Sequence, residues 1–221
     1  MIEVIFALPE ESRDFRRRLA ASPFASLVNV THGGVGPAAA GRHVERVLEH
    51  RPQMVVVAGF AGGLDPALRA GEVVVATNFS QPETVVRAAI ACGAKSGVFA
   101  HADLPVEAVE AKAALARSTG AVAVDMESQP IASACARFGV PVLVVRVISD
   151  PADEPLPVPF AEWFDLACQR PRPAALLRYL VSHPGQIAPF VRFVRGLAPA
   201  RRALVAVLLR WLDSQMIGRG P

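Results

Sequence analysis

One apolar run, residues 142–148, constrains the fold of this chain more than any other segment. Six of its seven residues are valine, leucine or isoleucine, which is typical of a strand covered on both faces of a sheet. Ser149 and Asp150 follow, and Pro151 cannot continue a strand ladder. We therefore place Asp150 at the carboxyl end of a central strand, where open α/β sheets bind their ligands.

Arg146 interrupts this run four residues before Asp150. A buried guanidinium group needs a partner, so Arg146 predicts a polar pocket under or beside the sheet. The alternative interpretation is a strand end at the surface, where Asp150 is an ordinary acid and Arg146 makes a structural ion pair. The segment by itself does not decide between the two.

Apolar segments and segments of helical character alternate along the first 150 residues. Strands are expected over 2–8, 27–31, 54–59, 72–76 and 95–100, and helices over 9–19, 37–50, 83–92, 106–117 and 125–137. This alternation favours an α/β fold with a parallel or mixed sheet. Asp125 would cap the last of these helices and Glu127 would lie in its first turn, which is a structural explanation for both acids.

Two glycine-rich segments follow predicted strands. Residues 33–36 join a strand to a helix, and the backbone N–H groups of such a loop can hold an anion; a tight turn that needs positive φ is the alternative. Residues 59–64 lack the glycine spacing of a dinucleotide site, and the chain has no Gly-Lys-Ser/Thr of a P-loop. We expect this second segment to allow a ligand to approach the backbone closely.

Composition bears on the cellular compartment of the protein and on whether it binds a metal or cofactor. Cys92, Cys135 and Cys168 show no metal-ligand spacing and the five histidines are scattered, so we expect free thiols in a reducing compartment, no metal and no cofactor. The N-terminus does not resemble a signal peptide, and no apolar stretch approaches the roughly 18 residues of a spanning helix. A cytoplasmic protein is predicted.

The last quarter of the chain differs in character. From residue 170 onward there are nine arginines, one aspartate and no lysine or glutamate. Helices are expected over 160–169, 174–182, 184–196 and 199–213, and apolar helices with interspersed arginine can lie on an anionic membrane. The alternative is that they pack on the sheet or on a second subunit. The basic residues do not form a lysine-rich groove with stacking aromatics, so nucleic-acid binding is not expected.

Five separated motifs together resemble the nucleoside phosphorylase and nucleosidase family. They are residues 10–11, 33–36, 59–64, 124–128 and 146–150, in the order and spacing of that family, and the resemblance covers roughly residues 1–165. The core is similar to methylthioadenosine/S-adenosylhomocysteine nucleosidases. Segments 123–128, 150–153 and 176–186, together with the short region before His101, are more similar to phosphorylases associated with hopanoid biosynthesis.

The resemblance implies a single-domain, three-layer α/β/α fold with a mixed sheet. We expect a catalytic domain over 1–169, a helical extension over 170–221 and a homodimer. It also implies purine N-glycosidic cleavage, in which Asp150 donates a proton to the leaving base. The resemblance also implies that Glu11 is the acid beside the nucleophile, that Glu127 binds the ribose hydroxyls and that Met126 packs under the sugar. Arg146 is expected to join the pocket's carboxylates. Further substrate contacts are expected from Asp125, Phe60, Gly34, Gly62, Asp103 and Val106.

Three departures from the family pattern bear on the reaction. Phe60 stands where hydrolytic members commonly have a small hydroxyl residue, and Pro105 and Val106 stand where an aromatic side chain often stacks on the purine. No arginine matches the phosphate-binding arginine of the phosphorylases, although Arg13 is near Glu11 in sequence. The nucleophile is therefore either water or inorganic phosphate as a co-substrate.

The sequence predicts an enzyme that releases adenine from a lipid-linked adenosyl compound, adenosylhopane, at the inner face of the cell membrane. The first alternative is a soluble methylthioadenosine/S-adenosylhomocysteine nucleosidase, which would not need the basic apolar tail. The second is a nucleoside-binding relative without turnover. Retention of Asp150, Glu127 and Glu11 argues against a pure binder, which has no use for an acid beside the base.

Overall fold

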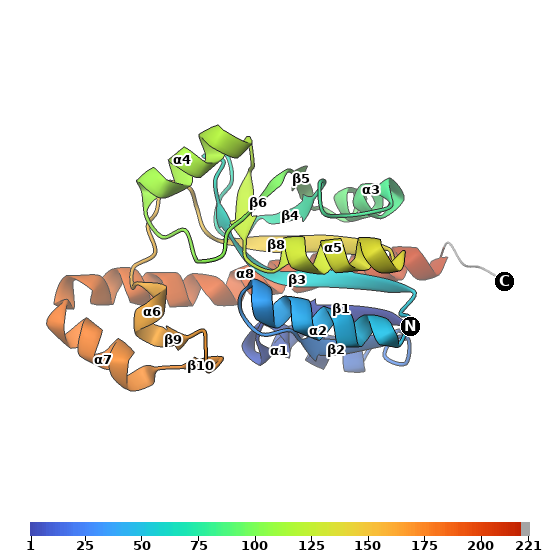
Figure 1. Cartoon of the computed structure of the whole chain (residues 1–221), viewed down its shortest axis with the longest axis horizontal. Coiled ribbons are helices and arrows are strands. Elements are labelled where there is room, and N and C mark those ends of the chain that lie inside the picture. The colour runs from blue at the N-terminus through green and yellow to red at the C-terminus, as the bar shows by residue number, and fades with distance from the viewer. Residues whose placement is uncertain (218–221) are drawn as a thin grey trace.

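One eight-stranded mixed sheet forms the centre of the computed structural model, which describes residues 1–217 (Figure 1). Its strands are β1 (Ile2–Phe6), β2 (Val28–His32), β3 (Met54–Gly63), β4 (Val73–Ala76), β5 (Lys95–Gly97), β6 (Phe99–His101), β7 (Ala123–Asp125) and β8 (Val142–Asp150). The main path runs β2-β1-β3-β8-β4-β5, while β7 pairs with β3 and β6. Strands β2, β1, β3 and β8 are parallel, whereas β4 is antiparallel to β8.

Helices surround the sheet and extend beyond it at one end (Figure 1). They are α1 (Pro9–Ala20), α2 (Pro37–Glu49), α3 (Glu83–Ala91), α4 (Val109–Thr119), α5 (Ser128–Phe138), α6 (Phe160–Trp163), α7 (Pro173–Ser182), the 3₁₀ helix η1 (Pro184–Gln186) and α8 (Ile187–Ile217). A small antiparallel pair, β9 (Phe164–Asp165) and β10 (Arg170–Pro171), lies between α6 and α7.

Alternation along the central strands divides the buried residues between two cores. In β3, Val55 and Val57 pack with α2 and α5, whereas Val56 and Ala58 pack with α1, α3 and α8. Successive side chains of a strand point to opposite faces, so an uninterrupted apolar strand can fill both cores. The result is helix, sheet and helix in three layers, which confirms the predicted fold class.

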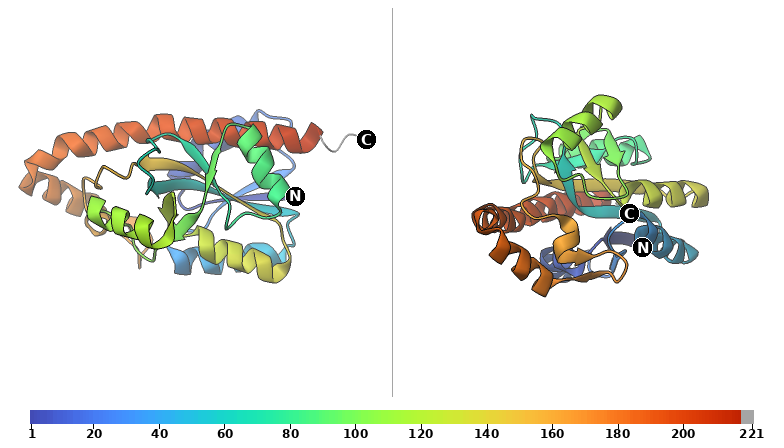
Figure 2. Two further views of the ribbon diagram at one scale, coloured as in Figure 1. Left: turned by 90° about the horizontal axis from the view of Figure 1, so that it is seen from above. Right: turned by 60° about the vertical axis from the view of Figure 1, so that its left-hand side comes forward.

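The C-terminal helix differs from the prediction. The segments expected as separate helices over 184–196 and 199–213 form η1 and the single helix α8, with Pro199 inside it. Proline removes a backbone donor and normally breaks a helix, but the turns after Pro199 bury Leu204, Val205, Leu208 and Trp211 in the core against the sheet. This half of α8 therefore packs on the sheet, as one of the two alternatives proposed (Figure 2).

Three other boundaries are corrected. The helix expected over 160–169 ends at Trp163 and gives way to the β9–β10 pair. The strand expected over 95–100 is two strands, because β5 pairs with β4 and β6 pairs with β7. Helix α5 begins at Ser128 rather than at 125, since β7 continues through Asp125.

Strand β3 continues four residues beyond its predicted end at Gly59. Its ladder with β8 pairs Gly59 with Arg146 and Gly62 with Asp150, with a register shift between Ala61 and Gly62. Most of the glycine-rich segment 59–64 is thus strand, and it lies beside the carboxyl end of β8.

Candidate active site

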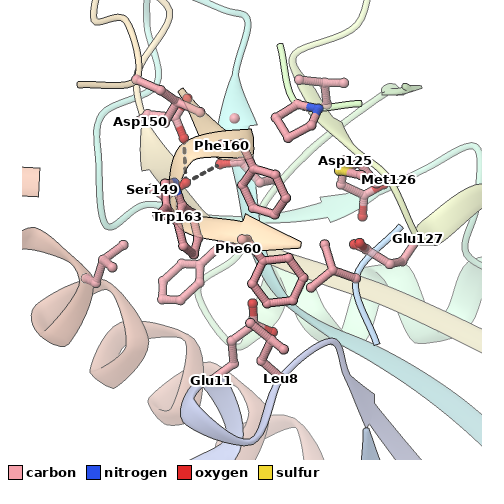
Figure 3. Close-up of a pocket in the computed structure, with 18 of the residues that line it drawn as sticks. Leu8, Glu11, Phe60, Asp125, Met126, Glu127, Ser149, Asp150, Phe160 and Trp163 are labelled. Carbon is pink, nitrogen blue, oxygen red and sulfur yellow. Dashed lines mark hydrogen bonds between the residues drawn. The ribbon is translucent and has the colours of Figure 1, made fainter. Parts of the chain in front are cut away.

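A cavity of about 580 Å³ opens at the carboxyl ends of β3 and β8, beside the end of β7. Asp150 and Glu11 lie on opposite sides of this cavity and Glu127 lies on a third side (Figure 3). The position agrees with the rule that open α/β sheets bind ligands at the carboxyl ends of their strands. Its volume is within the range of roughly 300–1,000 Å³ that is usual for small-molecule sites.

Arg146 holds two carboxylates at the base of the site. Its Nη2 atom lies 2.5 Å from Asp125 Oδ2 and 3.2 Å from Glu127 Oε2, and 1 % of its side chain is exposed. Ser128 donates hydrogen bonds from its backbone N–H and its hydroxyl to the Asp125 carboxylate. These ion pairs allow a guanidinium group to be buried within the sheet, and Arg146 joins the carboxylates as the sequence predicted.

Glu127 carries a carboxylate that is fixed from two sides. Its Oε1 atom accepts a hydrogen bond of 2.8 Å from the backbone N–H of Gly36, while Oε2 faces Arg146. Burial raises the pKa of Glu127, and the Arg146 guanidinium acts in the opposite direction. Met126 lines the cavity beside it, and both residues come from the turn between β7 and α5.

Glu11 enters the cavity from the first turn of α1. Its Oε2 atom accepts a hydrogen bond of 3.2 Å from the backbone N–H of Ala7. Burial raises the pKa of Glu11 to about 7; the Arg146 guanidinium lowers it and the Glu127 carboxylate raises it further. A carboxyl group with a pKa near neutrality can both accept and release a proton under ordinary conditions.

Asp150 is paired with a buried lysine that sequence analysis did not identify. Lys112 Nζ of α4 lies 2.6 Å from Asp150 Oδ2, and the lysine side chain is 0 % exposed. The hydroxyl of Ser149 donates a hydrogen bond of 2.5 Å to Asp150 Oδ1. Burial raises the pKa of Asp150, which is the direction a proton donor requires, while Lys112 and Ser149 lower it.

No pattern in the sequence distinguishes Lys112 from a surface lysine, because it stands among alanines in a helix of mixed polarity. Its burial arises from the loop after Asp150, which crosses α4. The ammonium group donates hydrogen bonds to the carbonyl oxygens of Pro151 (2.9 Å) and Glu154 (2.7 Å). These two carbonyl oxygens and the Asp150 carboxylate make three acceptors, one for each proton of the ammonium group.

The sequence profile of the phosphorylase superfamily matches residues 15–93 and 89–181 of this chain. The chain belongs to the phosphorylase superfamily. The family expected from the five motifs is therefore confirmed, and with it an enzyme of the phosphorylase and nucleosidase class.

Solved structures show the same fold at low identity. A futalosine hydrolase mutant of Helicobacter pylori is 20 % identical with a TM-score of 0.69, covering 96 % of this chain and 98 % of that one. The nucleosidase of Neisseria meningitidis in complex with methylthio-immucillin-A is 20 % identical with a TM-score of 0.68, covering 96 % and 98 %. That of Colwellia psychrerythraea in complex with adenine has 20 % identity, a TM-score of 0.68 and coverage of 96 % and 94 %.

This superfamily member uses its glycine loop differently from the expectation. The backbone N–H groups of residues 33–36 are all engaged: those of Gly33 and Gly34 with Phe6 and Ala7 carbonyls, that of Val35 with Gln169, and that of Gly36 with Glu127. The loop therefore has no free donors for an anion, and the prediction of an anion site there is wrong. Gly34 lies outside the main cavity and is needed as a glycine, because a Cβ atom would stand 2.8 Å from Gln169 Oε1.

The remaining predicted contacts divide into two groups. Phe60, Gly62, Asp125 and Val106 line the cavity. Asp103 does not line it: its side chain is 87 % exposed and lies 3.5 Å from His101 Nε2. The prediction of Asp103 as a substrate contact is therefore corrected.

The C-terminal part of the chain closes the cavity with apolar side chains. They are Phe160, Trp163 and Phe164 from α6 and β9, and Phe193 and Leu197 from the first half of α8. Phe160 packs against Trp163 and Phe164 with ring centroids 4.7 and 5.3 Å apart. The sequence places Phe160, Trp163 and Phe164 close together, but nothing in it indicates that α8 reaches the same pocket.

Within residues 1–217, no helix combines the length and the apolar character needed to cross a bilayer. Residues 218–221, the end of the predicted helical extension, lie outside the described chain.

Proposed function

We propose that this protein hydrolyses the N-glycosidic bond of an adenosyl compound whose 5′ substituent is large and apolar, with adenosylhopane as the expected substrate. The observation that carries the proposal is a single cavity in which an acid, Asp150, faces a second carboxyl, Glu11, across an apolar space of about 580 Å³. Each chemical step can be assigned to one wall of this cavity.

Asp150 acts on the base. As the bond between the ribose and the purine breaks, negative charge develops on the purine, and a carboxylic acid beside the purine N7 atom neutralises it by donating a proton. The pKa of Asp150 is raised by burial, which favours the protonated form needed for donation. General acid catalysis of this kind contributes about 10²–10⁴ in rate.

Glu11 acts on the nucleophile. Its pKa of about 7 leaves a substantial ionised fraction at neutral pH, and an ionised carboxylate can accept a proton from an attacking water molecule. Glu127 and Met126, on the wall between Glu11 and Asp150, would hold the ribose through its hydroxyl groups and its apolar face.

Water fits this site better than phosphate. Among the side chains of residues 1–217 that line the cavity, Arg201 is the one cation, and it is paired with Asp14 at 2.9 Å. Arg13, the candidate phosphate ligand, is exposed and does not line the cavity. The glycine loop also has no free N–H groups. Neither that loop nor an unpaired cationic side chain of the described cavity lining is therefore available to neutralise a phosphate dianion.

The apolar wall supports a lipid-linked substrate. Phe160, Trp163, Phe193 and Leu197 would surround the 5′ side of a nucleoside whose base lies at Asp150 and whose ribose lies at Glu127. Burial of an apolar substituent there gains roughly 25 cal/mol for each Å² removed from water. This wall and the resemblance to phosphorylases associated with hopanoid biosynthesis together favour adenosylhopane over a small thioether.

The test is release of adenine from an adenosyl-linked hopanoid in detergent, with methylthioadenosine in a parallel reaction and each with and without inorganic phosphate. We expect efficient release from the hopanoid, a free sugar product and no dependence on phosphate. Phosphate dependence with a sugar phosphate product would contradict the choice of water. A preference for methylthioadenosine would make that compound, and not adenosylhopane, the substrate. Absence of adenine release from either compound would indicate a binding protein.

A further inference from the structure

Helix α7 and the first half of α8 lie at the end of the molecule that extends beyond the sheet (Figures 1 and 2). Each of the two helices exposes a row of apolar side chains. On α7, Leu177 and Val181 are 64 % and 72 % exposed. On α8, Ile187, Val191 and Val194 are also exposed. The spacings of four residues on α7 and of four and three on α8 place each set along one side of its helix.

Arginines border these two rows. Arg192 and Arg195 follow one edge of the α8 set and Arg178 lies next to Leu177, by helical geometry. All three are exposed, and none has an acidic partner within residues 1–217. We call the five apolar residues and these three arginines the α7–α8 patch.

A shallow hollow of about 420 Å³ adjoins the patch at the start of α7. Arg170, Arg172 and Arg178 line it together with small apolar residues. An apolar strip beside a hollow with three guanidinium groups is the arrangement that suits acyl chains beside phosphate headgroups, since arginine binds phosphate through paired donors.

The charge of this region disfavours a symmetric contact with a second copy. No aspartate or glutamate occurs between residues 166 and 212. A two-fold interface presents the same surface on both subunits, so two α7–α8 patches would bring their arginines together without an acidic partner from either patch. An anionic bilayer supplies the opposite charge, and each basic residue near such a surface strengthens binding about fivefold.

We propose that the α7–α8 patch docks on the surface of an anionic lipid bilayer. The first half of α8 would then lie along the surface, with its exposed apolar side chains in the headgroup region. Phe193 and Leu197 of the same helical segment line the cavity, and Pro171 lines both the cavity and the arginine hollow. Docking therefore places the apolar wall of the pocket next to the bilayer. Binding to vesicles needs no turnover, so this inference does not depend on the proposed function.

The experiment is sedimentation of the full chain with vesicles of phosphatidylcholine, with and without phosphatidylglycerol. One variant replaces the patch arginines, Arg178→Gln, Arg192→Gln and Arg195→Gln. A control with the same change in net charge replaces three exposed arginines elsewhere, Arg42→Gln, Arg51→Gln and Arg117→Gln. A third, Leu177→Asn with Val181→Asn, removes apolar contact without changing charge.

We expect the wild type to sediment with the anionic vesicles and to be released by salt. The patch arginine variant should lose about 100-fold in partition coefficient, the control should stay close to wild type, and the Leu177 and Val181 variant should also bind weakly. Equal binding by the two arginine variants, or no sedimentation of the wild type at low ionic strength, would overturn the proposal. So would a dimer by light scattering that the Leu177 and Val181 variant dissociates, because the patch would then be a subunit interface.

Discussion

Lys112 Nζ lies 2.6 Å from Asp150 Oδ2, and the two side chains are 0 % and 8 % exposed. This contact joins α4 to the end of β8 and orients the carboxyl that faces the cavity. The lysine charge lowers the pKa of Asp150 while burial raises it. Lys112 is therefore a positioning residue that also limits how far burial raises the pKa of Asp150.

Replacement of Lys112 by methionine tests this balance. Removal of the lysine charge should raise the pKa of Asp150 further, so Asp150 should stay protonated to higher pH and the alkaline limb of kcat/KM should move upward. Breaking a buried pair also costs about 3–5 kcal/mol of stability. The measurements are a pH–rate profile and denaturant unfolding. Lys95→Met, which changes the other lysine of the chain in an exposed ion pair with Glu72, is the control. An unshifted alkaline limb in the Lys112 variant would show that Lys112 does not limit the pKa of Asp150.

Asp150→Asn should strongly reduce release of the base. It should also lower stability, because Lys112 then loses the anion of its buried ion pair. Asparagine keeps the shape of the side chain but cannot donate a carboxylic proton, so we expect kcat to fall by about 10²–10⁴. Adenine release and circular dichroism measure the two properties. Asp153→Asn, at an exposed site three residues away, is the matched control and should keep its activity. Near-wild-type turnover by Asp150→Asn would show that another group protonates the base.

Glu11 should set the acidic limb of the pH profile. The carboxylate form is the one that accepts a proton from water, so kcat/KM should rise through a pKa of about 7, and Glu11→Gln should lose most of the rate together with this limb. Between pH 4.5 and 7 the folded chain holds a proton on Glu11 that the unfolded chain has released, so the free energy of unfolding falls as pH rises through this range. Glu11→Gln should thus gain stability relative to wild type at pH 8 but not at pH 4. An acidic limb that survives in this variant would assign it to another group.

Gly59 is predicted to tolerate no side chain. A Cβ atom at this position would stand 2.5 Å from Arg146 Nη1 and 2.8 Å from Glu11 Oε2, and the ion pairs of Arg146 leave the guanidinium little freedom to move. Gly59→Ala should destabilise the chain by about 1–3 kcal/mol and lower activity through both displaced groups. Gly196→Ala is the control, because nothing lies within 4 Å of a Cβ atom there and alanine favours a helix. Equal unfolding midpoints for the two variants would contradict the predicted clash.

The local pattern of the sequence determined the central strand, the alternation of strands and helices and the position of Asp150. A continuous apolar run that ends at a proline has few other ways to be buried. Arg146 within that run also predicted a polar pocket with a partner for its side chain, because a buried guanidinium group must be neutralised. The motifs then placed Glu11, Glu127 and Asp150 in one family site, and the structure brings all three to one cavity.

Only the tertiary structure decided three other features. Helix α8 continues through Pro199 because the residues after it gain core contacts that outweigh a local break. The N–H groups of the glycine loop are hydrogen-bonded within the protein, and two of their acceptors, Gln169 and Glu127, come from distant parts of the chain. Lys112 meets Asp150 because the loop after β8 crosses α4. Each of these contacts joins residues far apart in sequence, and propensity or spacing within a short window carries no information about them.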